Sequence, residues 1–102
     1  MVNQMFEKSL GKSMAQEPYR VTMPADLNGV LSYIPLGTHI ELTLVSSSGW
    51  EFVGNLLHSQ TRGRDYYQVS CRSNWLDGFK LGDIVQFRFS VGGKARPRLE
   101  AC

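Results

Sequence analysis

The sequence predicts a mainly β domain, a barrel or a sandwich of about seven short strands with two helical turns. Two observations lead to this class. Apolar and polar residues alternate with a period of two in several segments, which is typical of strands with one buried face. Helix signals are confined to two short segments, each limited by a glycine. A chain of 102 residues suffices for one core, so we expect one domain over residues 1–102, with its core from about 5 to 101.

The front of the chain should contain two strands and the first helix. The segments "MFEKSL" (5–10) and "RVTM" (20–23) are short strand candidates, and the polar stretch "GKSMAQEPY" (11–19) separates them. A helix of one or two turns is expected in "PADLNGVL" (24–31), because Pro24 suits a first helical position. These elements come before the longest strand pattern of the chain.

The middle of the chain should form three strands. In "THIELTLV" (38–45) the apolar residues occupy one face, and the turn signal "SSSG" (46–49) follows. A second strand then begins at Trp50. A third strand is indicated by alternating apolar residues at Tyr67, Val69 and Cys71. Large aromatic residues at strand and helix starts usually pack in the core or at its edge, so we expect Trp50 and Trp75 to pack there.

The last third of the chain should contain a short helix and two strands. "SNWLDG" (73–78) offers an N-cap and a terminating glycine, which predicts barely more than one helical turn. A strand is indicated by alternating apolar residues at Val85, Phe87 and Phe89. "VGGK" (91–94) is a hairpin signal into a final strand at 98–101, where Pro97 indicates an edge strand or a strand start.

A polar segment, "HSQTRGRDYY" (58–67), separates the second and third of the middle strands. A hairpin turn needs only about two to five residues, so this segment is longer than a turn requires. Within it Arg62 and Arg64 flank Gly63. One interpretation is a solvated loop in which the arginines pair with Asp65. The other is a loop whose guanidiniums contact a ligand.

Charge is unevenly distributed although the net charge is only +2. Residues 21–57 contain three acidic residues and no Lys or Arg, which gives −3 and leaves +5 for the remainder. Basic residues cluster in two segments. Residues 58–72 contain Arg62, Arg64 and Arg72, and residues 92–102 contain Lys94, Arg96 and Arg98. Such clusters form either a solvated surface or a basic face that meets phosphate. The roles of Lys94, Arg96 and Arg98 stay open.

Catalytic and metal sites are not indicated. "LGKS" (10–13) is similar to the end of a phosphate-binding loop, but Phe6 stands where that motif needs a glycine. His39 lies on the polar side of a strand, and the chain has only two histidines and two cysteines. Cys71 follows an apolar alternation, so we expect a buried small residue there and expect both it and Cys102 to be unpaired. We expect no enzyme activity, no cofactor and no small-molecule substrate.

Taken in order, the runs "YRVTMPADL", "HIELTLVSSSGWEFVGNLL", the basic segment and "NWLDGFKLGDIVQFRF" resemble the plant-type B3 DNA-binding domain. Its pattern of proline, two tryptophans, Gly-Asp and phenylalanine falls here at Pro24, Trp50, Trp75, Gly82, Asp83 and Phe87. The resemblance covers roughly residues 5 to 101. "WLDGFKL" (75–81) is shorter than the corresponding family segment, so the second helix should be clipped.

The resemblance implies an open seven-stranded pseudobarrel with two short helices, which grips the major groove of double-stranded DNA between two arms. The arms fall on 11–19 and 58–67. The DNA contacts that follow are Lys12, Ser13 and Gln16 in the first arm, and His58, Ser59, Gln60, Thr61, Arg62 and Arg64 in the second, with Arg72 as a phosphate contact. Arginine suits guanine and glutamine suits adenine, because each forms two hydrogen bonds with that base.

The expected function is therefore sequence-selective DNA binding by the module of a plant transcriptional regulator in the nucleus. No apolar run approaches the ~20 residues that cross a membrane, and the start of the chain lacks the pattern of a secretory signal. Other domains or protein partners in a longer regulator are compatible with this function. The alternative is a non-catalytic β-barrel module that binds a protein or a small ligand, with the basic loop incidental.

Overall fold

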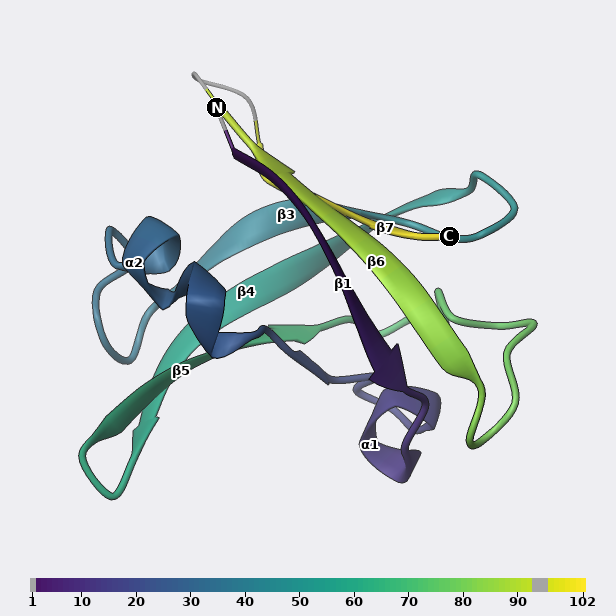
Figure 1. The fold of residues 1–102 in the computed structure, drawn as a ribbon, viewed down its shortest axis with the longest axis horizontal. Helices are drawn as coiled ribbons and strands as arrows, with labels where there is room; N and C mark the ends of the chain where they lie inside the picture. The colour runs from purple at the N-terminus through teal and green to yellow at the C-terminus, as the bar shows by residue number, and fades with distance from the viewer. Residues whose placement is uncertain (1, 93–95) are drawn as a thin grey trace.

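The computed structural model describes residues 2–92 and 96–102. Seven strands form one curled sheet in the order β1-β6-β7-β3-β4-β5-β2 (Figure 1). The strands are β1 (Val2–Ser9), β2 (Val21–Thr22), β3 (His39–Val45), β4 (Glu51–Thr61), β5 (Arg64–Ser70), β6 (Ile84–Val91) and β7 (Arg98–Ala101). Neighbouring strands are antiparallel except β3 and β7, which are parallel. The prediction of a mainly β, seven-stranded open pseudobarrel with two short helices is confirmed.

The first predicted helix is present, and the second is not. Residues 24–31 form a 3-10 turn, η1 (Ala25–Leu27), which follows Pro24 and continues into α2 (Asn28–Leu31). The helix predicted over 73–78 is wrong: the amide of Trp75 donates to the carbonyl of Ser73, which is the bond of a turn. Burial of the adjacent Trp75 and Leu76 holds this segment in an irregular path. None of the described helices is long and apolar enough to span a membrane.

The second short helix lies instead in the polar stretch 11–19. It is α1 (Lys12–Ala15), and its single buried residue is Met14. The amide of Arg20 donates to the carbonyl of Ser13 at 2.8 Å, so the chain folds back on itself after the helix. One methionine among polar residues gives no helical period, which is why the sequence did not indicate this helix.

The long polar loop predicted around Arg62 is also wrong. β4 runs to Thr61 and β5 begins at Arg64, and these two residues face each other in the ladder. Only Arg62 and Gly63 make the turn, with φ of +52° and +77°. Positive φ at both central residues is what a two-residue type I′ turn requires. The extra polar residues therefore lengthen both strands into one extended hairpin.

The core fills the inside of the curled sheet, and it contains one of the two tryptophans. Trp75 is fully buried, and its ring meets Phe87 at a centroid distance of 5.8 Å. Trp50 is 72% exposed, so the prediction that it packs in the core or at its edge is wrong. The backbone of Trp50 is bonded to Ser46 across the β3–β4 turn, which directs the indole away from the core. Cys71 is buried, and both cysteines are free, as predicted.

The end of the chain agrees with the prediction where the structure describes it. β6 and β7 pair as antiparallel strands, with Ser90 opposite Arg98. Pro97 precedes β7 and therefore stands at a strand start. Half of the turn predicted for 91–94, including Lys94, lies outside the described residues.

Candidate nucleic-acid interface

The strands β4 and β5 present one face to the core and one face outward. On β5 the inward side chains of Tyr67 and Val69 are buried. The outward positions on β5 are Arg64, Tyr66, Gln68 and Ser70. Arg72 follows two residues after the strand ends. Because side chains alternate along a strand, the four residues of β5 lie on one face, and Arg72 lines the same hollow as Ser70. In the ladder, Thr61 stands opposite Arg64, and Ser59 stands opposite Tyr66.

The short strand β2 adds a third row to this outward face. β2 pairs with β5 so that Thr22 stands opposite Gln68. The Gln68 amide nitrogen donates to the Thr22 hydroxyl at 3.3 Å. Arg20 is exposed and lies two residues before Thr22, so it continues the same row. The outward face therefore extends from the end of the first arm, next to Arg20, across β2 to the β4–β5 hairpin.

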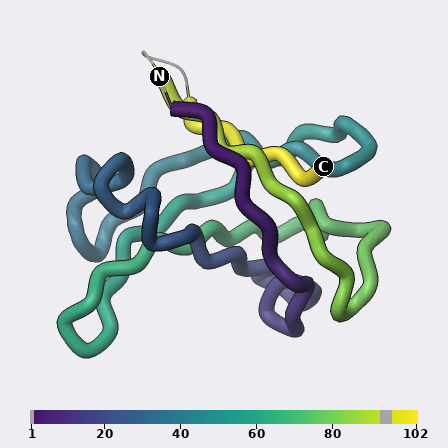
Figure 2. The backbone as a smooth tube through the Cα atoms, viewed as in Figure 1, coloured from purple at the N-terminus to yellow at the C-terminus, as the bar shows by residue number. Residues whose placement is uncertain are grey.

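A groove follows this face between the two arms. It is lined by Pro18, Arg20, Leu57, Ser59, Tyr66, Gln68 and Ser70. Beyond Pro18 and Ser70 the hollow continues past Asn55 to Arg72. In Figure 2 the α1 segment and the tip of the β4–β5 hairpin lie on the same, lower side of the molecule. The two arms predicted from the sequence thus flank one groove.

The groove and the adjoining hairpin carry four arginines. Arg20 and Arg72 line the groove, and Arg64 lies on the outward face of the hairpin next to Arg62 at its tip. Within the described residues, these four arginines form no ion pair. The interpretation that Arg62 and Arg64 pair with Asp65 is therefore wrong. Asp65 has the opposite parity on β5 and accepts a hydrogen bond from Gln60 at 3.1 Å.

The arginines near the end of the chain contrast with those of the groove. Arg98 donates to Glu100 at 2.7 Å and to Glu51 at 3.2 Å. The hydrogen bond to Glu100 is the main cause that raises the pKa of Arg98. Arg96 lies 3.5 Å from Glu41. The positive charge of Arg96 and Arg98 is thus balanced within the fold, whereas that of the groove is available to a ligand.

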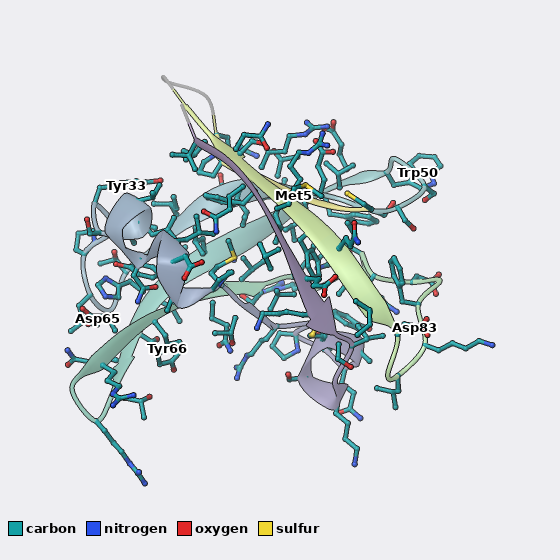
Figure 3. All side chains as sticks on the ribbon, in the orientation of Figure 1. Met5, Tyr33, Trp50, Asp65, Tyr66 and Asp83 are labelled. Carbon is teal, nitrogen blue, oxygen red and sulfur yellow. The ribbon has the colours of Figure 1, made fainter. Side chains whose placement is uncertain are left out.

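The structure separates the predicted contact residues into two groups. Most are on the arms or on the outward face and are at least partly exposed: Lys12, Ser13, Gln16, Ser59, Gln60, Thr61, Arg62, Arg64 and Arg72. His58 is different, because it has inward parity and is only 8% exposed. The ring is covered on the core side of β4, so its burial does not favour a contact with DNA. Asp65 and Tyr66, which are labelled in Figure 3, mark the position of β5 in the β4–β5 hairpin.

Sequence reasoning missed three residues of the groove: Arg20, Tyr66 and Gln68. Tyr66 and Gln68 were visible as the polar partners of the Tyr67 and Val69 alternation, and their parity matches that of Arg64. Arg20 carries no such signal. Its position follows from the pairing of β2 with β5, which joins residues about fifty positions apart in the chain.

The described residues contain no cluster of three or more His, Cys, Asp or Glu side chains that could hold a metal ion. The chemistry that the groove offers is hydrogen bonding by guanidinium, amide and hydroxyl groups. Guanidinium groups bind phosphate and base edges through charge-assisted hydrogen bonds. The site is therefore suited to a polyanionic ligand.

The fold and the groove define an open β half-barrel whose two arms flank a basic surface. A solved structure has the same fold: the "Arabidopsis FUS3-DNA complex" matches with a TM-score of 0.60 and 15% sequence identity over 94% of this chain and 93% of that chain. At this identity the likeness concerns the fold. No protein-family model matches the chain. No curated protein matches it in sequence.

Proposed function

We propose that this chain binds double-stranded DNA in the major groove, with the β4–β5 hairpin and the α1 segment as its two arms. The observation that carries the proposal is the extended hairpin with unbalanced arginines at its tip and along its outward face. The major groove is about 12 Å wide and admits a two-stranded β-ribbon. A hairpin of this kind has the width and the charge to enter it.

Each part of the interface has its own role in this proposal. Arg62 and Arg64 bind base edges, where a guanidinium can form two hydrogen bonds with a guanine. Arg20 and Arg72 in the groove, and Lys12 on α1, bind phosphates and fix the orientation of the duplex. Ser13, Gln16, Ser59, Gln60 and Thr61 add polar contacts to bases or phosphates.

The proposed biological role is that of a non-catalytic DNA-binding module of a plant transcriptional regulator acting in the nucleus. The support is the fold shared with the FUS3 domain, whose structure was solved as a complex with DNA. Selectivity for particular sequences is part of the proposal, because the exposed hairpin side chains are those that distinguish bases in the major groove.

The experiment is selection of bound duplexes from a random pool, followed by affinity measurements on a selected and a scrambled duplex at two salt concentrations. We expect an enriched sequence and an affinity that falls steeply as salt rises, since phosphate contacts release counterions. An apolar pocket that binds a small ligand or a peptide would respond little to salt. Binding that neither selects a sequence nor weakens with salt would contradict the proposal.

A further inference from the structure

One pair of facing residues carries most of the contacts that attach the β4–β5 hairpin to the body of the protein. His58 and Tyr67 face each other in the ladder. The amide of His58 donates to Thr38, and the carbonyl of His58 accepts from Gly37 at 2.9 Å. On the other strand, the carbonyl of Tyr67 accepts from the amide of Met23 at 2.8 Å. Beyond this pair, the carbonyl of Asp65 accepts a hydrogen bond from Nδ2 of Asn28 in α2 at 3.2 Å. The described hydrogen bonds of residues 59–64 stay within the hairpin.

The side chain of His58 adds contacts on three sides of its ring. Nδ1 lies 2.6 Å from the carbonyl oxygen of Ile34. A carbonyl only accepts, so Nδ1 carries the hydrogen and donates it. The ring stacks on Tyr67 at a centroid distance of 4.4 Å. Nε2 faces a carboxylate oxygen of Asp65 at 3.4 Å.

The partner of His58 belongs to a rigid part of the molecule. Ile34 is fully buried and follows α2, whose Leu31 is also fully buried. The hydrogen bond from His58 therefore joins the hairpin to a residue fixed by the core, on the side of β4 opposite the groove. A buried hydrogen bond of this kind restricts the angle at which the hairpin leaves the sheet.

We propose that His58 is a positioning residue for the DNA-binding hairpin. In this proposal His58 does not touch DNA. Through its contacts with Ile34 and Tyr67 it holds residues 59–66 in the orientation in which the hairpin can enter the major groove of DNA. The inference about DNA selection rests on the proposed function. Base recognition depends on placing donor groups within a fraction of an ångström, so a hairpin that is free to swing keeps its phosphate attraction and loses discrimination between bases.

Two substitutions of His58 separate its contacts. His58→Phe keeps a ring that can stack on Tyr67 and removes the donor to Ile34. His58→Asn places an amide nitrogen close to the position of Nδ1 and can restore that hydrogen bond. The matched control is Ser46→Ala, because Ser46 is also 8% exposed and its hydroxyl accepts from the amide of Trp50 at the other end of β4.

Hydrogen exchange tests the positioning without DNA. For His58→Phe we expect faster exchange of the amides of residues 59–66, at a temperature where the variant stays folded, and unchanged exchange in the 46–50 turn. His58→Asn should recover part of the protection of residues 59–66. Ser46→Ala should speed exchange in the 46–50 turn and leave the exchange of residues 59–66 unchanged. Unchanged exchange of residues 59–66 in His58→Phe would overturn the proposal, whatever the DNA result.

Affinity for a selected and for a scrambled duplex then tests the consequence. We expect the ratio of the two affinities to fall by about fivefold or more in His58→Phe, the lower end of typical coupling between sites, and to hold in Ser46→Ala. An equal loss on both duplexes, or no change in the ratio, would overturn the role in selection. If the wild type itself shows no selection between duplexes, the proposed function fails. Hydrogen exchange alone then tests whether His58 positions the hairpin.

Discussion

Arg62 occupies a backbone conformation that favours other residues. Its φ of +52° lies in the left-handed region, where Asn and Gly are preferred at the first central position of a type I′ turn. An arginine there gains nothing for folding, because its side chain is exposed at the hairpin tip. Unfavourable backbone conformations often occur at functional sites. The choice of residue at this position therefore supports a contact outside the protein.

This conflict between turn and ligand gives a prediction for Arg62→Asn. We expect the melting temperature to stay equal or to rise, since Asn-Gly is the preferred sequence of this turn. Affinity for the selected duplex should fall by about 1–3 kcal/mol, with a smaller loss on scrambled duplex, because the lost bonds go to a base edge. Thermal melting and fluorescence anisotropy measure the two effects. Retention of full affinity and selectivity would remove Arg62 from the site.

The two tryptophans should respond in opposite ways to replacement by alanine. Trp50→Ala should change the free energy of unfolding by no more than about 0.5 kcal/mol, as for other exposed residues. Trp75→Ala should cost about 3–5 kcal/mol, because it removes a fully buried indole. Denaturant unfolding of both variants measures the difference. A large loss in Trp50→Ala would mean that its indole packs in solution.

Individual residues also mark the limit of prediction from sequence. The period of two placed Val69, Phe87 and Phe89 in the core, because each strand reports its own buried face. His58 is hydrogen-bonded to Ile34, which lies 24 residues away in the chain. A local alternation of apolar and polar residues cannot predict such a contact. Trp50 was misplaced because the pattern does not show where the core ends along a strand.

Among the longer elements, the β4–β5 hairpin shows why a strand can be mistaken for a loop. Its outer residues have no core to face, so both faces are polar and the alternation of apolar and polar residues disappears. The ladder nevertheless continues to Thr61 and Arg64. Polarity and arginines marked this segment in the sequence, but the predicted loop conformation is wrong. Its role as a DNA-binding arm stays a prediction.

The fit of β4 against its neighbours depends on Gly54. A Cβ at this position would lie 2.5 Å from Cδ1 of Leu44 and 2.8 Å from the carbonyl oxygen of Ser70. Gly54→Ala should therefore destabilise the protein by about 1–3 kcal/mol, through displaced backbone between β4 and β5. In Gly29→Ala, within α2, the added methyl meets nothing within 4 Å, and we expect stabilisation by about 0.5–1 kcal/mol.

Melting temperatures of these two glycine variants test the packing of the sheet. About 1 kcal/mol corresponds to roughly 4–8 °C in a domain of this size. Gly54→Ala should thus melt well below the wild type and Gly29→Ala a few degrees above it. A normal melting temperature for Gly54→Ala would show that β4 can move away from Ser70 without loss.

For the molecule as a whole, the arrangement of charge matters more than its total. A net charge of +2 is too small to draw a protein strongly to DNA. The fold neutralises Arg96 and Arg98 with carboxylates, places Arg20 and Arg72 in the groove, and puts Arg64 on the outward face of the adjoining hairpin. These groove arginines come from distant parts of the chain, so only the folded sheet assembles the basic surface. Basic clusters are visible in the sequence, but which of them the fold pairs with carboxylates is not.

This arrangement predicts which arginines determine the salt dependence of DNA binding. Each phosphate contact contributes about 0.9 to the slope of log affinity against log salt concentration. Arg20→Ala and Arg72→Ala should each lower that slope by about 0.9 and weaken binding to selected and scrambled duplexes alike. Arg88→Ala is the matched control, because Arg88 is an exposed arginine on β6, which three strands separate from β5 in the sheet.

Titration of each variant with duplex at four or more salt concentrations, about 50 to 200 mM, gives the slopes. We expect Arg88→Ala to keep the wild-type slope, although it removes the same charge as Arg20→Ala. Equal reductions in all three variants would mean that binding follows the net charge of the protein. An unchanged slope in both Arg20→Ala and Arg72→Ala would show that the duplex does not lie in the groove between the arms.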